Sequence, residues 1–430
     1  MGSSPEQQPV SARRAARAFR LDPAIHAQLT RPGVRPAQPE AAAAAETLSL
    51  PDPVYPRRPE LPEDGGWRLL YHLRSGARGV RCWVVPYLKS RLYPHEFRPL
   101  LAFFFTDYAC NLDCQYCWAH DPRKGMTEDT ARRAIDWLHA LDCRVLALMG
   151  GEPLIRPRFV HKVIDYGTQR GFFVYLPTNG RLLTPEWIDR FGDAGVATIN
   201  LAVDCVREKP GLPKALEHIR PQFDYLVRRQ QRYGYMIVFN INICHNNLDD
   251  VKELTRIAYA NGISSDYHIN EEPLVEHAHF AHLEDNHTFL TPEDYPRVDA
   301  LLDYLQARSR RGVIMVNSKK HLADMKAFMR GTVDPWPCRA GQSTLIIRTD
   351  GTLAPCFAMD SATHDWGTVG NPKFDSQQLE AMKKACNTRC LSTCNYVTGY
   401  YYHGARWFWW ALKQLVHGYQ GVREEPAAAA

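Results

Sequence analysis

The sequence predicts an α/β fold, a partial (β/α)6 TIM-like barrel followed by a small C-terminal domain. From about residue 98 to residue 290, apolar segments alternate with amphipathic segments, which is the pattern of parallel strands connected by helices. Cysteines, glycines and amides directly follow several apolar segments, and in a parallel barrel these positions meet at the end where active sites lie. Beyond residue 290 the alternation stops.

The predicted strands are short apolar runs. The first of them, PLLAFFFT, is apolar over nearly its whole length, which indicates a buried strand. Strands are predicted at 99–106, 143–150, 172–180, 196–203, 235–244 and 264–272.

The predicted helices carry start signals. Thr127 and Thr184 precede amphipathic runs as N-caps, and Pro185 suits the first turn of its helix. Helices of the barrel are predicted at 127–141, 158–171, 184–195, 212–230 and 248–262, with two more at 291–309 and 319–331.

The chain divides into six predicted segments. The first is rich in Pro and Ala and lacks apolar periodicity, which is typical of a disordered tail. The aromatic run 400–410 predicts a helix packed on the C-terminal domain, or a contact with a membrane surface or an apolar substrate. The predicted segments are a tail (1–65), an N-terminal lead-in (66–97), the barrel (98–290), a helical connector (291–335), the C-terminal domain (336–400), and an aromatic helix and tail (401–430).

Composition and charge exclude several classes of protein. The 52 basic and 47 acidic residues leave a net charge of +5, too little to indicate a nucleic-acid partner. No apolar run approaches the roughly 18 residues of a membrane-spanning helix, and the N-terminus lacks the apolar core of a secretory signal. Twelve cysteines without such a signal favour metal or redox chemistry over disulfides, and we expect a cytoplasmic protein.

Four of the cysteines are scattered through apolar sequence. A lone cysteine in such a setting is usually a small buried side chain without a chemical role. This interpretation applies to Cys82, Cys143, Cys205 and Cys244.

Three cysteines follow the first predicted strand in one short loop: Cys110, Cys114 and Cys117. A structural zinc site needs four ligands, and the nearest candidate for a fourth is His120. An iron–sulfur cluster held by three cysteines instead leaves one iron open, and an open position is typical of a catalytic metal. The spacing therefore favours a catalytic cluster, with zinc as the alternative.

The C-x3-C-x2-C loop after a first barrel strand, with Tyr116 before the third cysteine, resembles the radical S-adenosylmethionine (SAM) enzymes. The Gly-Gly-Glu-Pro sequence after the second strand resembles that family's second motif, which contacts the SAM amino group. The resemblance covers roughly residues 98 to 275. It implies a [4Fe–4S] cluster whose open iron binds SAM, and reductive cleavage of SAM to a 5′-deoxyadenosyl radical that abstracts hydrogen from a substrate.

The resemblance also assigns roles to single residues, although it assigns none to a catalytic side chain. The three loop cysteines would hold the cluster, and Tyr116 would pack near the adenine. Polar residues at later strand ends would contact the ribose or the carboxylate, although Asn200 and Asn242 fit a role as strand caps equally well. The residues expected at the methionine part are Gly150, Gly151, Glu152 and Pro153, and those at the strand ends are Asn179, Asn200, Asp204 and Asn242.

A second group of cysteines lies near the C-terminus: Cys338, Cys356, Cys386, Cys390 and Cys394. Residues 344–349 and 352–356 predict a hairpin turning at Asp350–Gly351, which would bring Cys338 and Cys356 together. The spacing C-x12-G-x4-C resembles the start of the SPASM or twitch extension of radical SAM enzymes, which carries auxiliary [4Fe–4S] clusters. The C-terminal domain is therefore expected to be an iron–sulfur domain.

The number of cysteines in this second group limits the auxiliary site. Of the longer SPASM pattern only C-x3-C-x3-C follows, and five cysteines fully ligate one cubane but not two. We expect one auxiliary cluster held by Cys338, Cys356 and two of the last three cysteines. The choice among those three, a zinc site with the same ligands, and a second cluster with an open iron all stay open.

The substrate is not determined by these motifs. Residues 66–97 are short for the fused leader-recognition domain of some peptide-modifying relatives, which favours a small molecule or a separate recognition protein. The expected reaction is oxidation, epimerisation or bond formation on a small molecule or natural-product intermediate. Maturation of a peptide is the alternative, and a non-catalytic zinc-binding protein is the alternative of another class. The resemblance implies an electron donor of the flavodoxin or ferredoxin type, and no corrinoid-binding segment is evident.

Overall fold

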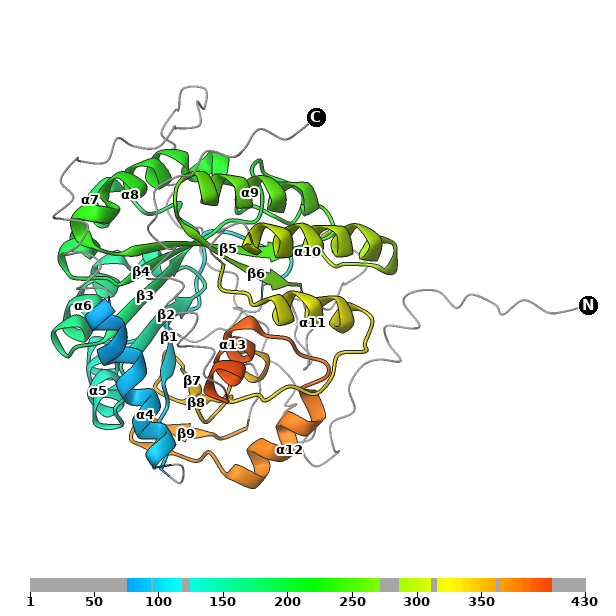
Figure 1. The fold of residues 1–430 in the computed structure, drawn as a ribbon. Helices are drawn as coiled ribbons and strands as arrows, with labels where there is room; N and C mark the ends of the chain where they lie inside the picture. The colour runs from blue at the N-terminus through cyan, green and yellow to red at the C-terminus, as the bar shows by residue number, and fades with distance from the viewer. Residues whose placement is uncertain are drawn as a thin grey trace, which may run out of the picture.

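The computed structural model describes residues 76–93, 96–117, 124–270, 286–310, 315–360 and 364–403. Its centre is an eight-stranded sheet in the order β6-β5-β4-β3-β2-β1-β7-β8 (Figure 1). Neighbouring strands from β6 to β7 are parallel, and β8 is antiparallel to β7. The expected α/β fold with a partial barrel of six strand–helix units is confirmed.

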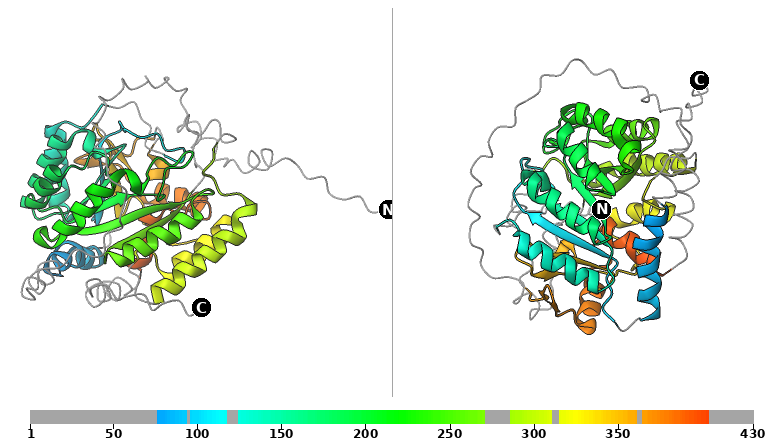
Figure 2. Two further views of the ribbon diagram at one scale, coloured as in Figure 1. Left: turned by 90° about the horizontal axis from the view of Figure 1, so that it is seen from above. Right: turned by 90° about the vertical axis from the view of Figure 1, so that its left-hand side faces the viewer.

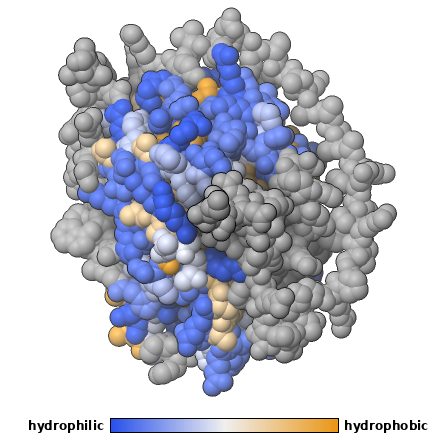
Figure 3. Space-filling model, turned by 90° about the vertical axis from the view of Figure 1, so that its right-hand side faces the viewer, coloured by the Kyte–Doolittle hydropathy of each residue, from blue (hydrophilic) through white to orange (hydrophobic). Residues whose placement is uncertain are grey.

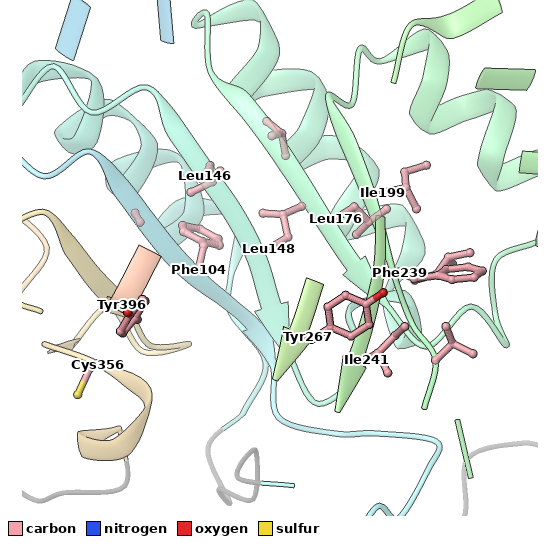
Figure 4. Packing of buried hydrophobic residues seen from close by; sticks show 14 of the residues in the cluster. Phe104, Leu146, Leu148, Leu176, Ile199, Phe239, Ile241, Tyr267, Cys356 and Tyr396 are labelled. Carbon is pink, nitrogen blue, oxygen red and sulfur yellow. The ribbon is translucent and has the colours of Figure 1, made fainter. Parts of the chain in front are cut away.

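The six barrel strands lie where the apolar runs predicted them. The long apolar run of β1 is explained by burial on both faces. Phe104 lies in the large cluster between the sheet and its helices (Figure 4), whereas Phe103 and Phe105 lie in a second cluster on the concave face. The strands are β1 (Leu101–Asp107), β2 (Val145–Gly150), β3 (Phe173–Thr178), β4 (Thr198–Ala202), β5 (Met236–Ile243) and β6 (Ser264–Ile269).

Helices cover the outer face of the sheet (Figures 1 and 2). The two predicted N-caps are confirmed, because the Thr127 side chain accepts a hydrogen bond from the Thr130 amide and the Thr184 side chain accepts one from the Trp187 amide. The helices are α5 (Glu128–Ala140), α6 (Pro157–Gln169), α7 (Pro185–Asp193), α8 (Arg220–Tyr233), α9 (Leu248–Ala260), α10 (Tyr295–Arg310) and α11 (Lys319–Met329).

The prediction of a helix over 212–230 is wrong in its first part. Helix α8 begins at Arg220, after a 3-10 turn over Leu216–Ile219. The Lys214 carbonyl accepts a hydrogen bond from the Asp204 amide, 2.8 Å away, so this backbone is bound to the end of β4. The segment before α8 is consequently a loop of the site and not a helix.

The C-terminal hairpin extends the barrel sheet. β7 (Thr344–Ile347) pairs in parallel with β1, and β8 (Leu353–Ala354) returns antiparallel after a turn in which Gly351 has a φ of 85°. The predicted hairpin is confirmed. The boundary of a separate domain at residue 336 stays a prediction.

Helix α13 (Thr393–Tyr402) lies across the open side of the barrel and contacts both β6 and β7 (Figure 1). The Thr393 hydroxyl donates to the Tyr267 carbonyl of β6 at 3.4 Å, and the Thr344 hydroxyl of β7 donates to the Asn395 side chain at 2.7 Å. The helix before α13, α12 (Ser376–Cys386), ends at one of the C-terminal cysteines. The second cysteine group is thus tied to the barrel.

The N-terminal lead-in forms a helix at the far end of the strands from the site. It comprises η1 (Val80–Val84) and α4 (Val85–Leu92). The Arg78 guanidinium donates to the Gly195 carbonyl, just before β4, and the Cys82 thiol donates to the Gly171 carbonyl, just before β3. This helix therefore covers the N-terminal ends of the strands.

The four scattered cysteines are buried, as predicted: Cys82, Cys143, Cys205 and Cys244. Within the described ranges, no helix has both the length and the apolar composition needed to cross a membrane. The described surface on the side of α10 to α12 is mainly hydrophilic, with scattered apolar residues (Figure 3). The predicted tail 1–65, His120 and residues 404–410 of the aromatic run lie outside the described residues.

Candidate cofactor site

The three-cysteine loop leaves the end of β1 and is held in place by backbone contacts. The Ala109 amide donates to the Asp107 carboxylate at 3.0 Å, and the Gln115 amide donates to the Gly211 carbonyl at 3.2 Å. Burial raises the pKa of the Cys110 thiol to about 11 and that of Cys114 to about 12, and the thiols of the loop interact electrostatically. The structure thus brings the three cysteines together as predicted.

No group of three Cys, His, Asp or Glu side chains placed to hold a metal ion occurs among the described residues. The role of the three loop cysteines as cluster ligands stays a prediction.

The glycines after β2 allow two loops to approach each other closely. A Cβ atom on Gly150 would lie 2.2 Å from the Asp107 carbonyl oxygen, and one on Gly151 would lie 2.4 Å from the carbonyl oxygens of Tyr108 and Ala109. The Gly151 amide donates to the Asp107 carbonyl at 3.0 Å, and the Glu152 amide donates to the Ala109 carbonyl at 2.9 Å. The motif therefore fixes the base of the cysteine loop.

The Glu152 carboxylate is buried and bound by the protein itself. It accepts hydrogen bonds from the Leu154 backbone amide (2.9 Å), the Thr178 hydroxyl (2.7 Å) and the Asn179 backbone amide (2.7 Å). Burial raises its pKa, although these bonds favour the charged form. Glu152 thereby joins the end of β2 to the end of β3. The buried Pro153 begins the 3-10 turn that follows Glu152. Its predicted role at the methionine part of SAM stays a prediction.

Tyr116 is fixed between the cysteine loop and the end of β4. Its hydroxyl donates to one oxygen of the Asp204 carboxylate. The other oxygen accepts a hydrogen bond from the Asn242 backbone amide at 2.9 Å. Its ring packs against an apolar cluster that contains Cys205 and Cys244. Asp204 is only 1% exposed, so we infer that its carboxylate anchors Tyr116.

Lys214 is a site residue that the sequence analysis missed. Its Nζ lies 5.1 Å from the centroid of the Tyr116 ring. Burial lowers the pKa of this ammonium, but the Cys114 thiol, the Asp204 carboxylate and the other two loop thiols outweigh burial and raise it overall. The residue was placed in a predicted helix, where a lysine is usually solvated, although Gly211 and Pro213 beside it are typical of a loop.

The predicted asparagines differ in whether their side chains already have hydrogen-bond partners within the protein. The Asn179 side chain donates to the Asn111 side chain at 2.8 Å and accepts from the Arg181 amide at 3.0 Å. The Asn200 side-chain oxygen on β4 is buried and has no hydrogen-bond partner in the described part of the chain. Buried polar atoms normally have partners, so this oxygen fits a contact with a bound molecule.

The C-terminal cysteines divide into two sets. Cys356, which follows β8 (Figure 4), is buried, and the thiols of Cys386 and Cys338 both raise its pKa in addition to burial. Cys390 is buried within the same apolar cluster, and its carbonyl accepts from the Trp336 indole at 2.8 Å. Cys394 on α13 packs instead against the cluster on the concave face of the sheet.

Comparison with known proteins identifies the barrel. Residues 107–269 match the Radical SAM superfamily. The barrel is a radical SAM domain. The matched region runs from the end of β1 to the end of β6, so it contains the cysteine loop, the Gly-Gly-Glu-Pro motif and the residues around Tyr116.

The radical SAM domain has relatives among curated proteins. The chain is 32% identical over 166 residues to an AdoMet-dependent heme synthase of Methanosarcina barkeri, which is 35% of this chain and 46% of that protein. It is 29% identical over 109 residues to the mycofactocin maturase MftC of Mycobacterium tuberculosis, which is 25% of this chain and 28% of that protein. The chain spans about half the length of the heme synthase and less of the maturase.

Two solved structures are similar to this chain in fold over about three quarters of its length. SuiB of Streptococcus suis bound to its precursor peptide SuiA has a TM-score of 0.53 and 13% identity, covering 72% of this chain and 75% of that chain. The anSMEcpe structure with AdoMet and the Kp18Cys peptide has a TM-score of 0.50 and 16% identity, covering 74% of this chain and 98% of that chain. These likenesses concern the fold alone.

Replacing Gly151 with Ala should separate the two loops. The added Cβ meets backbone oxygens that cannot move aside, so we expect a loss of about 1–3 kcal/mol in the free energy of unfolding and less iron bound at the cysteine loop. Gly79→Ala is the control, because a Cβ there meets nothing within 4 Å. Denaturant unfolding and iron analysis test this; equal values for the Gly151→Ala protein and the parent would contradict it.

Replacing Tyr116 with Phe removes the hydroxyl from the buried Asp204 carboxylate. A buried carboxylate that loses a donor costs about 1–3 kcal/mol, so the apoprotein should unfold at lower denaturant concentration. Tyr259→Phe on α9 is the matched control, because that hydroxyl has no hydrogen bond within the described ranges. A Tyr116→Phe protein as stable as this control would show that the bond does not anchor the loop.

Proposed function

We propose that the chain is a radical SAM enzyme that abstracts hydrogen from a small molecule or natural-product intermediate. The observation that carries the proposal is the three-cysteine loop, which the glycines after β2 hold at the C-terminal end of the radical SAM barrel. A [4Fe–4S] cluster held by Cys110, Cys114 and Cys117 would supply the electron that cleaves SAM to a 5′-deoxyadenosyl radical. An external donor of the flavodoxin or ferredoxin type is proposed for the reduced cluster.

The chain's own residues would bind and orient SAM. Tyr116, held by Asp204, offers a fixed ring face for the adenine. The partnerless Asn200 oxygen can accept a hydrogen bond from a ribose hydroxyl or an ammonium group. The Lys214 ammonium provides positive charge beside the cysteine loop, where it would attract the SAM carboxylate.

An auxiliary [4Fe–4S] cluster is proposed at the second cysteine group. Its ligands would be Cys338, Cys356, Cys386 and Cys390. The thiols of Cys338 and Cys386 act electrostatically on Cys356, and Cys390 follows the turn in which the Arg389 amide donates to the Cys386 carbonyl. Cys394 is left out because it packs on the concave face of the sheet. Four thiolates would complete the ligation of a cubane and leave no iron open.

The relatives bear on the class of substrate. The first curated relative carries the name of a heme synthase, which supports a small molecule. A peptide substrate is the second candidate, because a named peptide maturase and a structure with a bound precursor peptide are also similar to this chain. Comparing the small molecules and the peptides of cells with and without this chain would distinguish the two.

Anaerobic reconstitution with iron and sulfide, followed by a strong reductant and SAM, tests the proposed reaction. We expect about eight iron atoms per chain and release of 5′-deoxyadenosine. About two zinc ions per chain and intact SAM would instead establish the structural zinc alternative.

Changing Cys110, Cys114 and Cys117 together to Ala should abolish SAM cleavage. The auxiliary site should keep its metal, so the iron content should fall by about four atoms and not to zero. Cys82→Ala, at a buried cysteine beneath the barrel, is the control and should cleave SAM normally. Retained cleavage in the triple variant would refute the assignment.

Comparison of Cys390→Ala with Cys394→Ala tests the auxiliary ligands. We expect the first change to lower the iron content of the reconstituted protein by up to about four atoms and the second to leave it unchanged. Loss of iron in the Cys394→Ala protein alone would show that α13 supplies the fourth ligand.

A further inference from the structure

Helix α12 carries a buried lysine beside the C-terminal cysteines. Lys383 is 5% exposed, whereas the next residue, Lys384, faces solvent. The Lys383 Nζ donates to the Gln342 side-chain oxygen at 2.8 Å. Lysine is almost never buried to this extent unless an opposite charge lies nearby.

The groups around Lys383 do not include a carboxylate that could pair with it. In the described ranges, no Asp or Glu oxygen lies within ion-pair distance of its Nζ, and the exposed Glu380 acts on it only from further away. Burial lowers the pKa of the Lys383 ammonium overall, and the thiols of Cys338 and Cys356 act on it in the opposite direction. A thiol bears no charge while it is protonated, so a buried ammonium here is costly unless something anionic occupies the cysteines.

A second cation near the C-terminal cysteines, Arg339, contacts other groups. Arg339 lies over the ring of Tyr402, 3.7 Å from its centroid, and donates to the Ser343 hydroxyl at 2.8 Å. Gln342, by contrast, holds the Lys383 ammonium from the side of the hairpin. The position of the Lys383 charge is therefore fixed by the fold.

We propose that Lys383 is the counter-charge of the auxiliary cluster and raises its reduction potential. This inference rests on the proposed role of Cys338, Cys356, Cys386 and Cys390 as cluster ligands. A cluster with four thiolates is anionic and gains one more negative charge on reduction. A fixed cation in a buried setting therefore stabilises the reduced state more than the oxidised state.

The second link between Lys383 and the cysteines is its place on α12. Cys386 lies three residues further along, on the same side of the helix, and its thiol donates to the Lys383 carbonyl at 3.8 Å. The ligand and the counter-charge thus belong to one rigid element. A cluster whose potential is raised in this way is suited to accept an electron, and its complete ligation by four cysteines leaves no iron for a substrate.

The test measures the potential of the auxiliary cluster and not the activity of the enzyme. The parent protein is the full chain with Cys110, Cys114 and Cys117 changed to Ala, so that only the auxiliary cluster gives a signal. Redox titrations followed by electron paramagnetic resonance compare Lys383→Met, Lys383→Arg and the matched control Lys384→Met. Iron analysis confirms that each variant carries the cluster.

We expect Lys383→Met to lower the ratio of reduced to oxidised cluster about tenfold at the parent's midpoint potential, which is a shift of about 59 mV for one electron. Lys383→Arg and Lys384→Met should keep the midpoint of the parent. If Lys383→Met fails to bind the cluster, Lys383→Arg should still bind it, because the charge is kept.

Three results would overturn the inference. An unchanged midpoint in an iron-loaded Lys383→Met protein would refute the role of Lys383 while leaving the proposed function intact, as would loss of the cluster in both Lys383 variants. A parent protein that binds no auxiliary cluster would overturn the inference together with the proposed auxiliary site.

Discussion

The close approach of the loop after β2 to the end of β1 is the constraint on which the rest of the site depends. Because Gly150 and Gly151 lack side chains, their backbone contacts the carbonyls of Asp107, Tyr108 and Ala109. These carbonyls immediately precede the first cysteine. The position of the cysteine loop is thus determined by the parallel pairing of two barrel strands, and the buried Glu152 extends the same fixation to β3.

Each of the two groups of cysteines is accompanied by a lysine. Lys214 lies over the ring of Tyr116 beside the first group, and Lys383 is bound by Gln342 beside the second. Thiolates and iron–sulfur clusters are anionic. A fixed cation therefore makes a thiolate easier to form and a cluster easier to reduce. The two lysines consequently give the two sites a common electrostatic character, although Lys214 also faces a carboxylate, that of Asp204.

Much of the fold followed from the sequence, because apolar runs of strand length and capped helices are local features. The six strands, the caps at Thr127 and Thr184 and the hairpin around Gly351 lie where the sequence predicted them. The three-cysteine loop was found because its ligands are adjacent in the chain. Lys214 was missed because it stood in a predicted helix, where a lysine is usually solvated. Lys383 was missed because no local pattern in the sequence marks a lysine that tertiary contacts bury. The pairing of β7 with β1, far apart in the chain, was likewise beyond a local pattern.

The central claim is that the cysteine loop leaves one iron open and that SAM binds there. Electron–nuclear double resonance of the reduced, iron-loaded protein with SAM labelled at its amino nitrogen tests this claim most directly. We predict a hyperfine coupling between the cluster and the labelled nitrogen, which requires the nitrogen to bind the cluster. A spectrum without this coupling, in a protein that carries its full iron content and is saturated with SAM, would contradict the claim.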